Sequence, residues 1–174
     1  SMVVDLDKTD PAGWDEDVSP AAASPVDEVI YEIHVRDFSV ADETCPAEMR
    51  GKYLGLAHQN PGEIATGVSH LKELGVTTVH LLPIQDYSAG MEEYNWGYWT
   101  ALFNVPEAQY STNPDDPKQA IKDLKATIKA LHDADIRVVL DVVYNHTSTS
   151  FGASPFDQAV PWYYFRTTPG GRLR

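Results

Sequence analysis

Three short runs of β-branched and apolar residues, separated by two amphipathic stretches, limit the fold of this chain more than any other feature. The runs cover residues 29–35, 76–82 and 136–143, and each has the composition of a β-strand. Strands this rich in Val, Ile and Leu are covered on both faces, as in parallel sheets. The β-α-β-α-β order therefore predicts an α/β fold with parallel strands and right-handed crossovers. A doubly wound open sheet and the start of a closed (β/α)8 barrel both fit this order.

Both amphipathic stretches carry apolar residues at helical spacing. The first covers residues 64–74 and stops at Gly75, a residue type that often ends helices in a left-handed conformation. The second starts at Asp116, a capping residue, and Pro117, and should end near Ala134. The residues at this spacing are Ile64, Val68, Leu71 and Leu74 in the first stretch, and Ile121, Leu124, Ile128 and Leu131 in the second.

The remaining segments show no sustained period. Residues 1–27 are rich in Asp, Pro and Ala, and we interpret them as an incoming linker or the tail of an upstream domain rather than part of a core. Residues 37–62, 83–115 and 147–174 are expected to form long loops.

The charge balance argues against several partners. The chain has 26 acidic and 13 basic residues, and the formal net charge of −13 repels phosphate backbones and anionic lipids. We therefore expect neither a nucleic-acid nor a membrane partner. The single cysteine, Cys45, allows no intrachain disulfide and no cysteine-based zinc site. No glycine-rich turn follows any predicted strand, which counts against a dinucleotide or P-loop site.

Parallel architectures place active sites in the loops that follow the strands, and two candidate side chains come at the end of the third predicted strand. Asp141 lies within this strand, where a carboxylate is either a structural ion-pair partner or a site carboxylate. His146 lies just beyond it, and a lone histidine there is more often structural than catalytic. Because His146 has no His or Cys partner at metal spacing, no zinc site is expected.

The loop after the second predicted strand holds four aromatic rings within six residues. Such rings either pack a loop or stack on sugar rings, with neighbouring amides and acids binding the sugar hydroxyls. Composition leaves both interpretations open. The four residues are Tyr94, Trp96, Tyr98 and Trp99.

Several separated motifs, in the same order along the chain, carry a resemblance to a known family. They are VVDLDKTDPAGW at 3–14, VIYEIHVRDFS at 29–39, GVTTVHLLPI at 75–84, YNWGY at 94–98 and VVLDVVYNH at 138–146. With these motifs the sequence resembles the alpha-amylase superfamily of glycoside hydrolases, and within it the type I pullulanases, which are debranching enzymes.

The resemblance implies a fold and an activity. Residues 28–174 would form the first three β/α units of a (β/α)8 TIM barrel, incomplete in this chain, and residues 1–27 would precede it. The implied activity is retaining hydrolysis of α-1,6-glucosidic branch linkages in pullulan, starch or glycogen. An α-1,4-glucan hydrolase or glucan transferase of the same superfamily, or a non-catalytic carbohydrate-binding fragment, stays open. Trp99-Thr100 departs from the usual pullulanase pattern, which puts the linkage specificity in question.

The resemblance also assigns roles to residues. Tyr98 would stack under the sugar at the cleaved bond, His146 would hydrogen-bond its hydroxyls, and Asp141 would support an arginine beside the nucleophile. Asn95 and Trp96 would shape the debranching cleft. Asn145 would orient the neighbouring loop, and the matching residue ligates calcium in some amylases.

Family members carry the nucleophile and the general acid after barrel strands four and five. We therefore expect no catalytic residue among residues 1–174, and no hydrolysis by this chain alone. The expected partners are an α-glucan and the remainder of the same enzyme, or another copy of the chain. No cofactor is expected to be required, although calcium is compatible with the resemblance.

Overall fold

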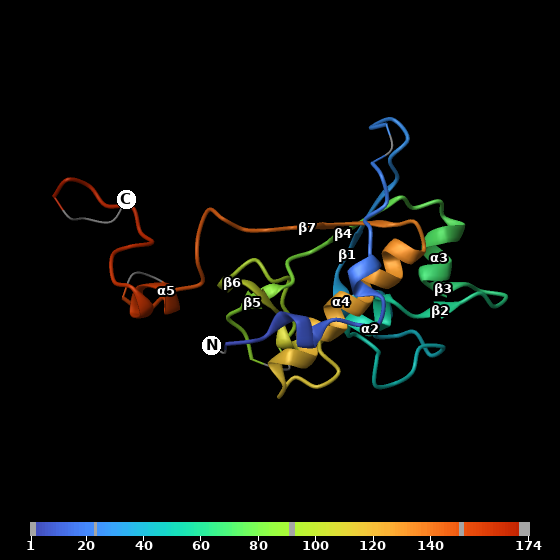
Figure 1. The fold of residues 1–174 in the computed structure, drawn as a ribbon, viewed down its shortest axis with the longest axis horizontal. Coiled ribbons are helices and arrows are strands. Elements are labelled where there is room, and N and C mark those ends of the chain that lie inside the picture. Colours follow the sequence, from blue (N-terminus) through green and yellow to red (C-terminus); the bar gives the residue numbers. More distant parts are fainter. Residues whose placement is uncertain (1–2, 23, 91–92, 150–151, 171–174) are drawn as a thin grey trace.

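A computed structural model describes residues 3–22, 24–90, 93–149 and 152–170. Its centre is a parallel three-stranded sheet in the order β1-β4-β7 (Figure 1), which confirms the predicted parallel strands. The strands are β1 (Ile30–Ile33), β4 (Thr78–Leu81) and β7 (Arg137–Leu140). Each is shorter than the run that predicted it, and β1 ends early because Val35 begins a helix.

Two helices pack on this sheet where the apolar spacing predicted them. Helix α4 (Pro117–Asp133) begins as expected, with the Asp116 carboxylate accepting a hydrogen bond from the Lys118 N–H. Helix α3 (Val68–Glu73) is shorter than predicted, because the backbone turns helical only after Gly67. Ile64 therefore lies outside α3 and is exposed, which corrects its predicted place on the buried face. Gly75 has the expected left-handed conformation.

Short elements that sequence periodicity did not reveal lie mostly in the three predicted loops. They are α1 (Val35–Ser39), α2 (Tyr53–Leu56), the β2–β3 hairpin (Gln59–Asn60 and Thr66–Gly67), the β5–β6 hairpin (Gln85–Tyr87 and Thr100–Pro106), η3 (Ala108–Tyr110) and α5 (Pro155–Ala159). Two of them reach beyond these loops, since α1 begins inside the predicted strand 29–35 and β3 lies inside the predicted helix 64–74. The helical ones have five residues or fewer, less than two turns, and β2, β3 and β5 have two or three, so no apolar period can repeat within them.

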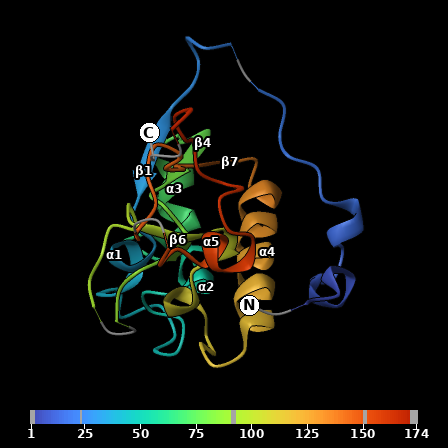
Figure 2. The ribbon, with the colours of Figure 1, turned by 90° about the vertical axis from the view of Figure 1, so that its left-hand side faces the viewer.

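The amino-terminal segment contacts α4 instead of standing free of the fold. It contains two short 3-10 helices, η1 (Leu6–Thr9) and η2 (Trp14–Glu16), and α4 lies between them and the sheet (Figure 2). Lys125 of α4 forms an ion pair with Asp10 and lies 5.3 Å from the Trp14 ring centroid. These contacts are with α4, and the hydrophobic core of the described residues includes none from this segment. The proposed identity of the segment as a linker or an upstream tail stays a prediction.

The two faces of the central sheet differ in exposure. Ile33, Val79 and Leu81 are buried in the core together with residues of the covering helices. Alternate strand positions point to the opposite face, where Ile30 is 63% and Val139 is 47% exposed. A parallel sheet normally has both faces covered, so this face is unusually open.

A polar cluster marks the amino end of the open face. Glu28 forms an ion pair with Arg137 and accepts a hydrogen bond from the Thr78 hydroxyl at 2.7 Å. The hydrogen bond from Thr78, followed by the contact with Arg137, lowers the pKa of Glu28 below its ordinary value. This end of the sheet is held by polar contacts, while candidate site residues gather at the other end. Within the described residues, no helix has both the length and the apolar character needed to cross a membrane.

Candidate functional site

Three of the predicted site residues meet at the carboxyl end of the sheet. Asp141 directly follows β7, and its N–H continues the ladder by donating to Leu81 O at 2.9 Å. The Tyr98 hydroxyl donates to Asp141 Oδ2 at 2.7 Å, across 43 positions of sequence. His146 Nε2 lies 3.0 Å from the carbonyl oxygen of Tyr98. The structure therefore brings Tyr98, Asp141 and His146 into one continuous cluster.

Asp141 lies one residue beyond the strand in which it was predicted. By strand alternation it shares the open face of the sheet with Arg137 and Val139. Its partner in the described residues is the Tyr98 hydroxyl. The implied contact with an arginine beside the nucleophile stays a prediction. The hydrogen bond to Asp141, followed by burial, raises the pKa of Tyr98 to about 12. Tyr98 is therefore a neutral hydrogen-bond donor throughout the physiological pH range.

His146 is held by protein contacts at both ring nitrogens. The Asn145 side-chain amide nitrogen lies 3.0 Å from His146 Nδ1. Because that amide nitrogen can only donate, Nδ1 accepts, and the ring proton lies on Nε2 and points to Tyr98 O. The Trp99 ring packs edge-on at 4.9 Å from the imidazole. A sugar hydroxyl would have to replace one of these partners, so here the histidine serves first to hold the Tyr98 backbone.

Asn95 and Trp96 lie just before this cluster in a tight turn. The Gly97 N–H donates to Asn95 Oδ1 at 2.8 Å, and the Trp96 indole N–H donates to the Tyr94 hydroxyl at 3.0 Å. Gly97 has φ +85°, and a Cβ there would lie 2.4 Å from Pro83 O. Only glycine fits this combination of φ and close backbone approach. The Trp96 side chain remains exposed, as a surface-lining role requires.

Sequence reasoning missed several residues that hold this turn. His34, at the end of β1, lies within hydrogen-bond distance of Asn95 O, and Asp37 accepts from the Tyr94 hydroxyl at 2.7 Å. Tyr94 and Trp99 were noted as aromatic residues but given no site role. Asp37 could have been found, because it closely follows the run 29–35 that was predicted as a strand, and loops that follow neighbouring parallel strands share one edge. His34 lies within that run and gave no separate signal.

The residues around Asn145 do not make a calcium site on their own. Calcium takes six to eight oxygen ligands, and no group of three or more acidic, His or Cys residues that could hold a metal ion occurs within the described parts of the chain. We therefore assign no step in the site to calcium.

Comparison with known proteins places this geometry in a family. Residues 62–168 match the family described as alpha amylase, catalytic domain. The pullulanase of Bacillus subtilis (strain 168) is 41% identical over 167 residues, which cover 91% of this chain and 23% of that protein. Pullulanase 1, chloroplastic, of Arabidopsis thaliana is 34% identical, in a match that covers 98% of this chain and 22% of that protein. The chain thus spans under a quarter of the length of these relatives.

Solved structures agree with this assignment. The pullulanase from Bacillus acidopullulyticus superposes with a TM-score of 0.86 at 45% identity, over 98% of this chain and 22% of that one. The pullulanase from Paenibacillus barengoltzii, in complex with maltohexaose and alpha-cyclodextrin, superposes with a TM-score of 0.85 at 43% identity, over 97% of this chain and 28% of that one. On the match to its catalytic domain over more than half of these 174 residues, the chain belongs to the alpha-amylase family of glycoside hydrolases.

Proposed function

We propose that residues 28–174 form the first three β/α units of a (β/α)8 barrel in an enzyme that hydrolyses α-1,6 branch linkages of α-glucans. The observation that carries this proposal is the cluster of Tyr98, Asp141 and His146 at the carboxyl end of a parallel sheet, in a chain of the alpha-amylase family. Active sites of parallel barrels lie at this end. Pullulanases among the similar proteins, one of them solved with maltohexaose, support the substrate class.

The open aromatic surface beside the cluster suits a glucan. Trp96 and Trp99 are both more than half exposed, and Tyr98 is partly exposed between them in sequence. Indole and phenol rings offer flat apolar faces for sugar rings while keeping a polar edge available. In this proposal Tyr98 provides the platform at the cleaved bond, and Asn95 and Trp96 shape the cleft.

The proposed division of labour follows from which side chains are already paired. Retaining hydrolysis needs one carboxylate as nucleophile and one carboxylic acid as proton donor, about 5–5.5 Å apart. Asp141 does not fill either role here, since its Oδ2 accepts a hydrogen bond from the Tyr98 hydroxyl and no second acid is paired with it in the described residues. Residues of this chain therefore bind and orient the substrate, and the nucleophile and acid would come from later strands.

A second candidate, an α-1,4-glucan hydrolase of the same family, is favoured by one observation. Trp99-Thr100 follows YNWGY where pullulanases usually carry an acid or amide and then proline. The Trp99 ring packs against His146, so this change lies beside the site rather than in a remote loop.

The open face of the sheet supports a proposed partner. Ile30 and Val139 would become buried if further barrel strands closed over this face, so we propose that it packs against the remainder of the same protein. A second copy of the chain is the alternative occupant.

The deciding experiment compares two substrates with the whole protein that contains this chain. Purified protein is incubated with pullulan, which has α-1,6 linkages, and with linear amylose, which has only α-1,4 linkages, and reducing ends are measured. A large preference for pullulan is expected. Hydrolysis of amylose alone would establish the second candidate instead, and no release from either glucan would reject both.

A further inference from the structure

We propose that His34 is a positioning residue whose Nε2–H fixes the backbone of residues 95–98 and thereby the placement of Tyr98. The inference deepens, and rests on, the proposed function. It is carried by a link between the end of β1 and the Asn95–Tyr98 turn, 61 positions apart in sequence.

The hydrogen bonds of His34 determine which nitrogen carries its proton. The Asp37 N–H donates to His34 Nδ1 at 3.3 Å, so that nitrogen accepts and the proton of the neutral ring lies on Nε2. Nε2 is 3.0 Å from Asn95 O and 3.2 Å from the Tyr110 hydroxyl oxygen. His34 is 9% exposed, so its bond to Asn95 is shielded from competing water. One nitrogen thus caps α1 and the other holds the turn.

The turn transmits this constraint to Tyr98 over three residues. Asn95 Oδ1 accepts from the Gly97 N–H, and Gly97 lies against Pro83 O with no room for a side chain. Tyr98 is the next residue. Its hydroxyl donates a hydrogen bond to Asp141, and its carbonyl oxygen lies within hydrogen-bond distance of His146 Nε2. Because rotation is limited at Asn95 and at Gly97, displacement of the Asn95 carbonyl would carry Tyr98 with it.

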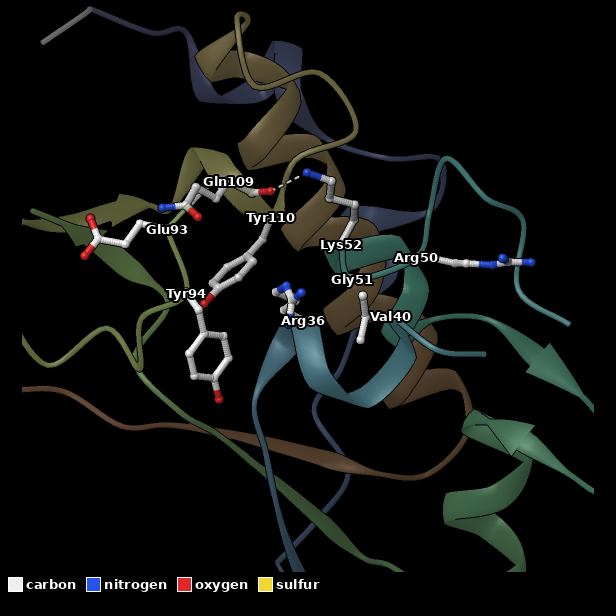
Figure 3. A pocket seen from close by; sticks show the side chains of 9 residues that line it. All are labelled: Arg36, Val40, Arg50, Gly51, Lys52, Glu93, Tyr94, Gln109 and Tyr110. Carbon is white, nitrogen blue, oxygen red and sulfur yellow. Dashed lines mark hydrogen bonds between the residues drawn. The ribbon is translucent and has the colours of Figure 1, made fainter. Parts of the chain in front are cut away.

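The other contacts of this turn with the β1–α1 region are weaker. Tyr94 is half-exposed, and its hydroxyl reaches Asp37 at the surface, where solvent competes. Arg36 lies 5.6 Å from the Tyr94 ring centroid, also at an exposed position. Arg36, Tyr94 and Tyr110 line a pocket of about 120 Å³. Figure 3 shows these side chains at the pocket, so one flank of Tyr94 is unpacked. The buried His34–Asn95 contact is therefore the stronger anchor.

Two substitutions separate the two nitrogens of His34 in the whole protein. In His34→Asn, Oδ1 stands where Nδ1 was and still accepts from the Asp37 N–H, but the side chain is too short to reach Asn95 O. In His34→Gln, the amide nitrogen stands near the place of Nε2 and donates to Asn95 O, but the helix cap is lost. The pair distinguishes positioning of the turn from capping of α1.

Two measurements are made on each variant: kcat/KM on pullulan, and amide hydrogen exchange by mass spectrometry. For His34→Asn we expect kcat/KM to fall about tenfold or more, with faster exchange at residues 95–99 and unchanged exchange in α4. For His34→Gln we expect kcat/KM within about threefold of the parent, with slow exchange kept at residues 95–99.

Outcomes that overturn the inference are equally definite. His34 would have a structural role only in any of three cases. The kcat/KM of His34→Asn could equal that of the parent, that of His34→Gln could fall below that of His34→Asn, or both variants could lose kcat/KM equally. Hydrogen exchange does not depend on catalysis. If the parent protein fails to hydrolyse pullulan, the proposed function fails, while the exchange of residues 95–99 still decides the role of His34.

Discussion

Removal of the Tyr98 hydroxyl isolates one contact of the candidate site. Tyr98→Phe keeps the ring that would stack on a sugar and deletes only the donor to Asp141, at a donor–acceptor distance of 2.7 Å. That length is typical of a hydroxyl donating to a carboxylate. Hydrogen bonds to charged groups contribute about 1.5–3 kcal/mol net, and partial exposure of both side chains places this one near the lower limit.

The consequence for catalysis can be worked out from that magnitude. A loss of about 1.4 kcal/mol of transition-state stabilisation is a tenfold loss in rate, so we expect Tyr98→Phe to lower kcat/KM on pullulan about tenfold in the whole protein. Asp141→Ala removes the same contact from the other side and should cost at least as much. If Asp141 acts by holding Tyr98, the double variant should be no slower than Asp141→Ala alone.

The assay is a double-mutant cycle on initial rates of reducing-end release, at substrate concentrations well below KM. Tyr31→Phe is the matched control, since its hydroxyl makes no hydrogen bond within the described residues, and it should keep the parent rate. Multiplicative losses, with the double variant slower by the product of the two single effects, would refute the coupling. Asp141 would then act through another residue, such as the arginine that the family resemblance implies.

Three further predictions concern the neighbouring residues and the open sheet face. His146→Ala should lower kcat/KM roughly 10²-fold and leave the melting temperature nearly unchanged, because His146 lies at the carboxyl end of the sheet and not in the hydrophobic core. Lost stability with near-normal activity would contradict this. Gly97→Ala should destabilise the protein by about 1–3 kcal/mol in chemical unfolding. The loss should exceed that of Gly152→Ala, because Gly152 also has positive φ but an added Cβ there has no neighbour within 4 Å among the described residues. Residues 1–174 expressed alone should self-associate through the face that contains Ile30 and Val139, and a monodisperse, cooperatively unfolding monomer in light scattering would contradict this.

The central sheet and the long helix could be predicted because their signals are local. Strand β4 lies within residues 76–82, where β-branched and apolar residues dominate, and α4 starts with a cap residue followed by proline, so a short window contains the evidence. The β5–β6 hairpin could not be found this way. Its register shifts at Asp86, and Asn104 in β6 has φ +60°, so no regular alternation survives in the sequence.

Part of the candidate site could also be predicted from the sequence, and part could not. The meeting of Tyr98 and His146 was predictable, since both follow neighbouring parallel strands and such loops share one edge of the sheet. Two contacts could not be predicted: the hydrogen bond from the Tyr98 hydroxyl to Asp141, and the contact between the His34 imidazole and Asn95 O. Each joins distant positions through side-chain geometry alone. Histidines are also ambiguous in sequence, and His34 reads as an ordinary strand residue until its partners are known.

The pairing of polar groups at this site has a consequence for how a glucan would bind. The Tyr98 hydroxyl is engaged by Asp141, and both nitrogens of His146 are engaged by protein groups. A polar group that is already satisfied gains little from exchanging its partner for a sugar hydroxyl. Exposed ring faces, as at Trp96 and Trp99, make no such exchange and gain from losing water. Truncation of the rings should therefore weaken binding of a maltooligosaccharide, whereas deletion of the paired polar groups should leave binding nearly intact and reduce turnover, because those groups fix where the rings stand.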